Sequence, residues 1–269
     1  FGTSSPELMV AIHAARDGVP QISLGDVLGS NVVNIALILA LVLSLSGMKA
    51  EDDGVRRDWG WALAVPFILT AVLWDGWFSR VDAVVLMGTF FLWLLLVVRR
   101  ARRHRARNVE EIIEAGRASL TKTVLLTLAG LGLLIVAAQC VVHGGQGVAL
   151  ALGWSPFVVG AVVVAVATGT PELATTIIAY LRGQHDVGLG NILGSNVFNA
   201  FFIAALAAFI HPFQVKLPEL VPSLVFGGVT TLLILPGRGG ALGRWRGVVL
   251  LGLYALYVTM TLQAGGAAH

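Results

Sequence analysis

One long stretch occurs twice in this chain, and the two copies lie 165 positions apart. The first copy contains TSSPEL at residues 3–8 and LGDVLGSNVVN at 24–34. The second contains TGTPEL at 168–173 and LGNILGSNVFN at 189–199. Nearly half of the positions from 3 to 41 match their partners without a gap, including proline, glutamate, glycine, serine and asparagine. The chain is therefore an internal duplication, and its fold has to accommodate two similar halves.

The composition places this duplication in a membrane. The chain is 57% hydrophobic and 12% charged, whereas a soluble domain has about 25% charged residues. The sequence pI of about 9.4 would fit a nucleic-acid-binding protein, but the Lys and Arg residues gather in short loops between apolar segments. We therefore expect a lipid bilayer and no nucleic acid as partner. Because Cys140 is the single cysteine, no internal disulfide framework is possible.

Apolar segments follow one another along the chain, each near the length that crosses ~30 Å of hydrocarbon as a helix. We expect nine transmembrane helices, at residues 1–16, 22–47, 59–75, 81–98, 121–143, 154–181, 187–210, 218–235 and 245–262. Two of these segments are longer than a plain span, which favours tilted or broken helices. The predicted fold class is an all-α polytopic membrane protein.

The charges in the predicted loops indicate the orientation. If alternate loops share a side, 15 of the 18 Lys and Arg residues lie on one side, and Arg16, Arg80 and Lys216 lie on the other. Loops rich in Lys and Arg usually stay in the cytoplasm. We therefore expect an integral protein of the plasma membrane, the inner membrane in a bacterium, with the basic linker 99–120 in the cytoplasm and the C-terminus outside.

The position of the repeat within these spans predicts an inverted architecture. From Glu7 to Glu172 the predicted chain crosses the membrane an odd number of times, so the two copies have opposite orientations. Inverted repeats are common in secondary transporters, which bind substrate near the midplane at the repeat interface. The expected units are a first repeat at 1–98, the linker at 99–120 and a second repeat at 121–269. By symmetry the first repeat lacks one helix and half of another, so we expect a full protein of five plus five helices.

Glu7 and Glu172 are the two acids that lie deep inside predicted spans. A charged side chain at the centre of a membrane helix costs about 2.5–3.5 kcal/mol, and such residues usually mark ion pathways. The sequence places no basic residue deep in any span to neutralise them, although a neutral, hydrogen-bonded glutamate is an alternative. We favour a functional site, because the duplication repeats the whole group of residues.

Each glutamate directly follows a proline, Pro6 or Pro171. Within a helix, proline lacks its N–H and displaces the carbonyl four residues earlier, which here belongs to Gly2 or Ala167. Such backbone is tolerated at membrane depth where it lines a cavity, so we expect these carbonyls to become cation ligands. The threonines that add hydroxyl oxygens at the same level are Thr3 and Thr168.

The second part of each motif adds more side-chain oxygens. Ser30 and Asn34 are four residues apart and share one helix face, with Asp26 near that face and closer to a span end. Ser195 and Asn199 repeat this arrangement. Alternatively, glycine, serine and asparagine in a membrane helix act as packing residues and interhelical hydrogen-bond donors. Beside the Pro-Glu pairs we favour cation ligands.

The predicted site contains carboxylates, amides, hydroxyls and carbonyls, but neither cysteine nor histidine. Such an oxygen set suits Ca²⁺ and Na⁺ rather than Zn²⁺ or copper. Two glutamates neutralise one divalent cation, and transport becomes an exchange if another cation replaces it on the same carboxylates. We expect no cofactor, since these ions are cargo. For Asn31 and Asn196, which lie 100° around the helix from the serines, the sequence leaves ligand and backbone-bracing roles open.

These residues resemble the sodium/calcium exchanger family of the cation/calcium antiporter superfamily, in its bacterial type. That family carries Gly-Thr-Ser-x-Pro-Glu-Leu and Gly-Asn-x-x-Gly-Ser-Asn-x-x-Asn/Asp, and here the first motif appears at residues 2–8. The resemblance implies ten helices in two inverted halves and exchange of Ca²⁺ for Na⁺ by alternating access. The ligands that it implies are Thr3, Ser4, Glu7, Ser30, Asn34, Thr168, Glu172, Ser195 and Asn199.

The chain departs from the family pattern in three respects. Ala167 and Gly169 stand where the family usually has Gly and Ser, which removes a hydroxyl from one expected sodium site. Asn199 is an amide where some members have Asp. Asp26 stands where Asn is usual and adds a carboxylate toward the outer mouth. These departures bear on the coupling ion more than on Ca²⁺.

Three other functions are weighed against Na⁺-driven Ca²⁺ exchange. An antiporter driven by H⁺ would use the same site, and a passive cation channel would conduct far faster than a carrier. An intramembrane enzyme would need a catalytic motif, and the sequence contains neither His-Glu-x-x-His nor Gly-x-Ser-x-Gly with a plausible base. We therefore expect no enzyme, and the sequence points to no particular protein partner.

Overall fold

The helices repeat along the chain with the offset found in the sequence. The computed structural model describes residues 2–49, 53–105, 120–235 and 240–266. Helices α1 (Ser5–Arg16) and α2 (Pro20–Val33) correspond to α9 (Thr170–Leu181) and α10 (His185–Phe198), and every boundary is displaced by that same offset. The two copies of the motif therefore adopt the same local structure.

A glycine turn separates the two helices of each pair. Gly18 has a φ of 76° and its repeat partner Gly183 has a φ of 69°. This left-handed conformation is open to glycine without steric cost and commonly ends helices. The turn ends α1 and α9, and it lets α2 and α10 start two residues later.

Both α2 and α10 continue through a π-helical segment that begins at a repeated asparagine. Segment η1 (Asn34–Leu39) leads into α3 (Ala40–Ser46), and η4 (Asn199–Ile203) leads into α11 (Ala204–Ile210). Insertions of π-helix are rare and often occur at functional sites. The composite helices α2-η1-α3 and α10-η4-α11 therefore carry an irregularity at equivalent places.

The other helices surround this pair of composite helices. They are α4 (Asp53–Val72), α5 (Arg80–Arg105), α6 (Leu120–Leu152), α7 (Pro156–Val159), η3 (Gly160–Val164), α8 (Ala165–Thr168), α12 (Leu217–Leu233) and α13 (Arg244–Gly266). The segment from α7 to α8 and the following α9 together form one span that is bent by 42°. The bend was expected, since 154–181 is too long for a plain span.

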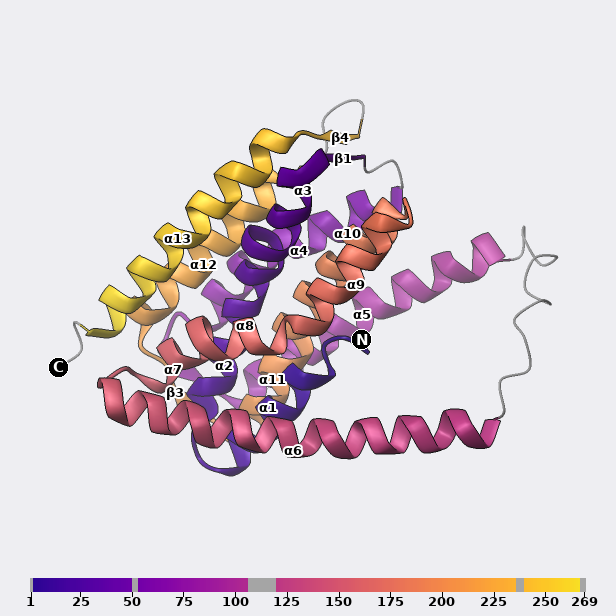
Figure 1. The fold of residues 1–269 in the computed structure, drawn as a ribbon. Coiled ribbons are helices and arrows are strands. Elements are labelled where there is room, and N and C mark those ends of the chain that lie inside the picture. Colours follow the sequence, from indigo (N-terminus) through magenta and orange to yellow (C-terminus); the bar gives the residue numbers. More distant parts are fainter. Residues whose placement is uncertain (1, 50–52, 106–119, 236–239, 267–269) are drawn as a thin grey trace.

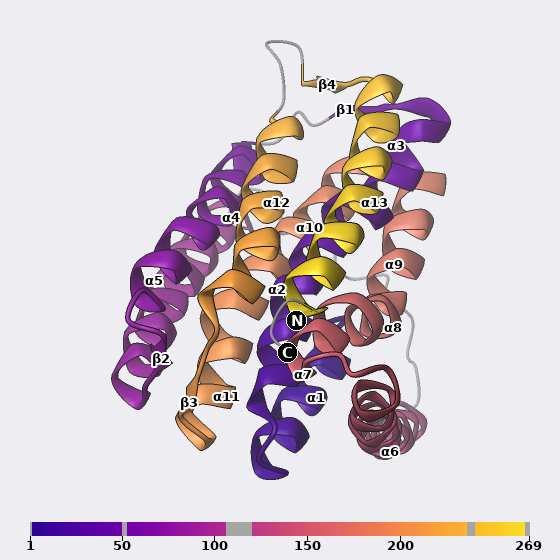
Figure 2. The same cartoon turned by 90° about the vertical axis from the view of Figure 1, so that its left-hand side faces the viewer.

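Two short antiparallel sheets link the two halves of the chain. Strand β1 (Met48–Lys49) pairs with β4 (Ala241–Leu242), and β2 (Trp77–Phe78) pairs with β3 (Phe213–Gln214). Figures 1 and 2 show β1 and β4 at the upper end and β3 at the lower end. Because β1 follows α3 and β3 follows α11, the two composite helices run in opposite directions.

The central helices are buried and the outer helices are exposed. Four helices are long and apolar enough to cross a membrane, or five if the bent span is included, in the part of the chain that the structure describes. Pro20–Ser46 is 83% buried and His185–Ile210 is 78% buried, whereas Arg80–Arg100 and Arg244–Gly265 are each 22% buried. This is the arrangement of a polytopic helical membrane protein with its polar residues inside. The number of nine spans stays a prediction.

Several predicted boundaries differ from the observed helices, and α4 begins at Asp53 rather than at 59. Helix α5 continues beyond the predicted span end at 98, to Arg105, and α6 runs to Leu152 rather than 143. A helix satisfies its own backbone hydrogen bonds, so it can extend past the apolar segment that hydropathy detects. Most of the predicted linker, residues 106–119, lies outside the described residues.

Helix α2 packs directly against the backbone of α7 and η3. A Cβ atom on Gly25 would lie 2.1 Å from the Phe157 carbonyl oxygen, and one on Gly29 would lie 2.3 Å from that of Ala161. Small residues allow such close helix approach. The close approach is not repeated at the partner positions Gly190 and Gly194, where a Cβ would meet no described atom of another segment within 4 Å.

Candidate cation site

The prolines of the motif determine where α1 and α9 begin. Both Pro6 and Pro171 occupy the first turn of their helices, where proline needs no N–H partner and has a suitable φ. Each glutamate follows in the same turn. In the second half, α8 ends at Thr168 and α9 begins at Thr170, so the proline accompanies the bend of the span.

The carbonyls that we expected to face a cation have hydrogen-bond partners. Gly2 O accepts a hydrogen bond from Ser5 Oγ at 2.8 Å, and Ala167 O accepts one from Thr170 Oγ1 at 2.9 Å. The residue before each proline thus supplies a hydroxyl that reaches back three residues. Both carbonyls are therefore hydrogen-bonded, in the same way in each half, rather than free to bind a cation as we expected.

Three carboxylates are completely buried: Glu7, Asp26 and Glu172. Glu172 Oε1 accepts hydrogen bonds from Ser4 Oγ at 3.1 Å and Ser195 Oγ at 3.4 Å. Its Oε2 atom has no hydrogen-bond partner, and neither do the two carboxylate oxygens of Glu7. Glu7, Asp26 and Glu172 therefore each present at least one buried carboxylate oxygen without a hydrogen-bond partner.

Asp26 is buried and forms a hydrogen bond to the other repeat. Its Oδ1 atom accepts hydrogen bonds from Thr168 Oγ1 at 2.9 Å and Ser30 Oγ at 3.3 Å, while Oδ2 has no partner. The expected position closer to a span end, toward the outer mouth, stays a prediction. Asp26 thus adds a third buried carboxylate to the two glutamates.

Thr3 and Thr168 each donate a hydrogen bond from one repeat to the other. Thr168 Oγ1 of the second repeat donates to Asp26, and Thr3 Oγ1 of the first repeat donates to Asn191 Oδ1 at 3.4 Å. Thr3 is the repeat partner of Thr168, and Asn191 is the partner of Asp26. The two bonds are therefore related by the duplication, but one ends on a carboxylate and the other on an amide. Asn191 also donates to Thr175 Oγ1 at 3.2 Å, a contact that the motif did not indicate.

The asparagines divide into two roles. Asn31 Nδ2 donates to Asn196 O at 3.2 Å, and Asn196 Nδ2 donates to Asn31 O at 3.1 Å. Asn34 Nδ2 donates to Asn196 Oδ1 at 2.9 Å, which leaves Asn34 Oδ1 without a partner. The side chain of Asn199 makes no hydrogen bond. Asn31 and Asn196 thus brace the backbone, whereas Asn34 and Asn199 offer amide oxygens.

Buried oxygen atoms without partners come from both repeats. They are Oε1 and Oε2 of Glu7, Oδ2 of Asp26, Oε2 of Glu172, Oδ1 of Asn34 and Oδ1 of Asn199. Leaving a buried polar group unpaired costs about 1–3 kcal/mol, and more for a charged group. The protein tolerates six such atoms among the predicted ligands, which is what a site completed by cations requires.

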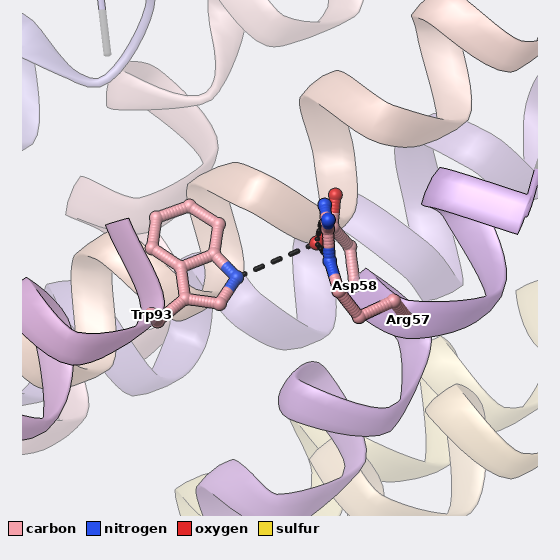
Figure 3. Close-up of polar contacts among 3 residues, drawn as sticks. All are labelled: Arg57, Asp58 and Trp93. Atoms are coloured by element: carbon pink, nitrogen blue, oxygen red, sulfur yellow. Dashed lines mark hydrogen bonds and ion pairs between the residues drawn. The ribbon is translucent and has the colours of Figure 1, made fainter. Parts of the chain in front are cut away.

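Two ion pairs among the described residues involve other acids. They are Arg57–Asp58 at 2.8 Å and Lys216–Glu219 at 3.6 Å. Figure 3 shows the first pair, with Trp93 Nε1 donating to Asp58 Oδ1 at 3.4 Å. Neither pair includes a carboxylate of the candidate site. The described residues also contain no cluster of three His, Cys, Asp or Glu side chains around one point, so hydroxyl and amide oxygens have to complete any cation site.

One further buried acid was missed by the motif reasoning. Glu219 is 5% exposed and lies in the first turn of α12. A signal for it existed, since Pro218-Glu219-Leu220 is a third occurrence of the Pro-Glu-Leu tripeptide. It escaped notice because it has no partner in the duplicated stretch.

Comparison with known proteins covers nearly the whole chain. The family profile described as "Sodium/calcium exchanger protein" matches residues 1–99 and 122–263. The chain is 31% identical to the inner membrane protein YrbG of Escherichia coli, covering 97% of this chain and 83% of that protein. It is 26% identical to the sodium/calcium exchanger MaX1 of Methanosarcina acetivorans, covering 97% and 85%. It is 24% identical to the Ca²⁺/H⁺ antiporter ChaA of Bacillus subtilis, covering 95% and 79%.

A solved structure shares the fold. The sodium/calcium exchanger from Methanococcus jannaschii matches with a TM-score of 0.67 at 26% identity, and the match covers 96% of this chain and 82% of that one. The helical membrane architecture described above is therefore that of a known transporter.

Proposed function

This chain belongs to the sodium/calcium exchanger family, and from that premise we propose that it exchanges Ca²⁺ for Na⁺ as a secondary antiporter. It is a transporter rather than an enzyme. The observation that carries the proposal is the set of buried side-chain oxygens without partners, which come from Glu7, Glu172 and the neighbouring motif residues of both repeats.

The charge of the site favours an exchange of one cation for another. Glu7 and Glu172 together carry two negative charges, which match one Ca²⁺. In a low-dielectric interior, uncompensated carboxylates are costly, so the site is stable only with cations or protons bound. Ca²⁺ therefore leaves readily only when other cations take its place on the same oxygens. The all-oxygen donor set suits both Ca²⁺ and Na⁺.

Each motif residue has a defined part in this scheme. Ser4 and Ser195 hold Glu172 through its Oε1 and leave Oε2 for the cation. Thr168 and Ser30 hold Asp26 in the same manner. The side chains that complete the coordination are Thr3, Asn34 and Asn199, which supply hydroxyl and amide oxygens.

The opposite directions of the two composite helices support alternating access. Repeats that are related by inversion have two equivalent conformations, one open to each side, with the ion site between them. The excess of Lys and Arg in the loops near β1 and β4 favours a cytoplasmic location for that end of the molecule. The end that carries β2 and β3 then faces outward, and the protein belongs in an inner or plasma membrane.

The ion gradient that drives Ca²⁺ movement tests the proposal. The intact protein, reconstituted in proteoliposomes, is expected to take up Ca²⁺ when an outward Na⁺ gradient is imposed without a pH gradient. Ca²⁺ uptake that requires ΔpH and ignores Na⁺ would replace Na⁺ by H⁺ as the coupling ion. Currents far above carrier turnover would instead identify a passive channel.

Proton coupling is the second candidate, and a specific residue favours it. Asp26 adds a third buried carboxylate where the repeat partner has Asn191. When Ca²⁺ leaves, a site with three carboxylates takes up one more monovalent cation than a site with two, and H⁺ or Na⁺ can provide it. The relative from Bacillus subtilis is a Ca²⁺/H⁺ antiporter by name. The two gradients in the experiment above separate the candidates.

A further inference from the structure

Glu219 repeats the local design of the two site glutamates outside the duplicated motif. Pro218 lies in the first turn of α12, and Glu219 follows it in the same turn, as in α1 and α9. The repeat offset pairs Glu219 with Gly54 in the first half, so no second copy accompanies it. A buried acid that the repeat does not require needs a separate explanation.

Of the two oxygen atoms in the Glu219 carboxylate, one accepts a hydrogen bond and the other has no hydrogen-bond partner among the described residues. Ser155 Oγ donates to Glu219 Oε2 at 2.8 Å, whereas Oε1 has no hydrogen-bond partner. Lys216 Nζ lies 3.6 Å from Oε1. The Lys216 side chain is 64% exposed and that of Glu219 is 6% exposed. A mobile, hydrated ammonium group thus stands in front of a buried carboxylate.

The Glu219 residue lies in the wall of a cavity. Glu219 lines a cavity of about 290 Å³ together with Gln21, Gln214, Ser155 and Lys216. A second cavity of about 570 Å³ shares Ser155 and Lys216 with it. Residues that carry one carboxylate, one hydroxyl and two amides therefore line a space that is large enough for a cation with part of its water shell.

The cavity and the candidate site share helix α2. Gln21 and Leu24 line it, and Asp26 lies five residues beyond Gln21 on the same helix, which is about 7.5 Å along the axis. On the opposite wall, Ser155 is the N-cap residue of α7, the helix that starts the bent span leading to Thr168. The cavity thus lies at the β2–β3 end, one to two helical turns from the nearest site carboxylate.

We propose that Glu219 is a recruitment site for hydrated divalent cations, Ca²⁺ in transport, at the outer mouth of the pathway. An arriving cation displaces Lys216 from Oε1 and keeps most of its water. A single carboxylate with few other ligands binds weakly, as sites of low charge count do, so the ion is readily passed inward. The role in transport rests on the proposed function, whereas the binding itself does not.

The transport arm of the test measures how uptake depends on external Ca²⁺ in proteoliposomes of the intact protein. Glu219→Gln keeps the bond from Ser155 but loses the charge, and we expect the half-saturating Ca²⁺ concentration to rise roughly fivefold with an unchanged maximal rate. Lys216→Met is expected to lower the half-saturating Ca²⁺ concentration, because the competing cation is removed. Asp75→Asn, an exposed acid at the same end, is the matched control and should leave this concentration unchanged.

A binding arm is independent of transport. Tb³⁺, an oxygen-seeking substitute for Ca²⁺, is added to the purified intact protein carrying Glu7→Gln and Glu172→Gln, so that the central site is disabled. Trp154 adjoins Ser155 and lines the larger cavity, so it should sensitise Tb³⁺ luminescence. The signal is expected to disappear with Trp154→Phe and with Glu219→Gln, and to persist with Asp75→Asn.

The outcomes separate this inference from the proposed function. If the wild-type protein moves Ca²⁺ but Glu219→Gln leaves both the saturation curve and the Tb³⁺ signal intact, the recruitment site is refuted and Lys216–Glu219 is only a structural ion pair. If the wild-type protein moves no Ca²⁺, the proposed function fails, and the Tb³⁺ signal alone decides whether Glu219 binds cations.

Discussion

Asn31 and Asn196 hold each other's main chain. The side-chain amide of each donates to the backbone carbonyl of the other, at 3.2 and 3.1 Å. The two residues are repeat partners, so the reciprocal bonds mark the place where the two halves meet symmetrically. Both side chains are buried, beside Ser30 and Ser195 in sequence. This pair therefore sets the distance between α2 and α10, which carry the site.

Asn31→Ala should destabilise the protein while leaving its affinity for Ca²⁺ close to normal. The substitution leaves the Asn196 carbonyl buried without its donor, which costs about 1–3 kcal/mol. The thermal unfolding temperature in detergent should fall. The double variant with Asn196→Ala should lose less stability than the sum of the losses in the two single variants. Gln184→Ala, at an exposed site just before α10, is the control. A large change in half-saturating Ca²⁺ with normal stability would assign Asn31 to the ligands instead.

Glu7→Gln and Glu172→Gln should each abolish Ca²⁺ transport by the intact protein. Removing one full charge near a bound divalent cation weakens binding by about 4 kcal/mol at an effective dielectric constant of 20, or roughly a thousandfold. Radiotracer flux in proteoliposomes measures the loss. Asp17→Asn, an exposed acid after α1, should transport like the wild type. Normal exchange by either glutamine variant is incompatible with the proposed site.

Asp26→Asn should preserve folding and change the charge that is moved with each Ca²⁺. Thr168 and Ser30 both donate to Oδ1, and an amide oxygen accepts these bonds as well. The variant removes one negative charge from the site, so we expect one fewer monovalent cation to be exchanged per Ca²⁺. Reversal potentials at clamped membrane voltage give this number, with Asp17→Asn again as control. Identical potentials for variant and wild type would exclude Asp26 from the coupling.

Gly29→Ala should prevent normal assembly of the two halves. Its Cβ would lie 2.3 Å from the Ala161 carbonyl oxygen, closer than any van der Waals contact, and backbone cannot give way as a side chain can. We expect a loss of about 3 kcal/mol or more, seen as low yield or a reduced unfolding temperature. Gly88→Ala in α5, with open space around the added Cβ, should be neutral. Equal stability of both variants would contradict the close contact of α2 with η3.

Much of the fold follows from local signals in the chain. The boundaries of α1 and α2 recur at α9 and α10 because local signals act over a few residues: glycine at 18 and 183, proline in the first turns of α1, α2 and α9, and Asp186 in that of α10. The burial of Glu7 and Glu172 was likewise expected, since both lie within apolar spans without a basic partner.

Other properties depend on contacts between distant segments. The burial of Asp26 could not be judged from hydropathy, because the segments that cover that turn, α7 and η3, belong to the other half of the chain. The bracing role of Asn31 and Asn196 requires the two helices to cross at these residues, and periodicity alone does not give a crossing point. The carbonyls of Gly2 and Ala167 were expected to stay loose because the hydroxyls of Ser5 and Thr170 were not considered as caps.

The two small sheets have a mechanical consequence. Each ties a connection of one half to a connection of the other, one at each end of the molecule, so the composite helices with α4, α5, α12 and α13 form a closed frame. Helices α1, α6 and α9 carry no strand, and α1 lies along α6 (Figure 1). If the protein works as proposed, we expect this frame to stay rigid and the helices outside the sheets to make the movement that alternates access.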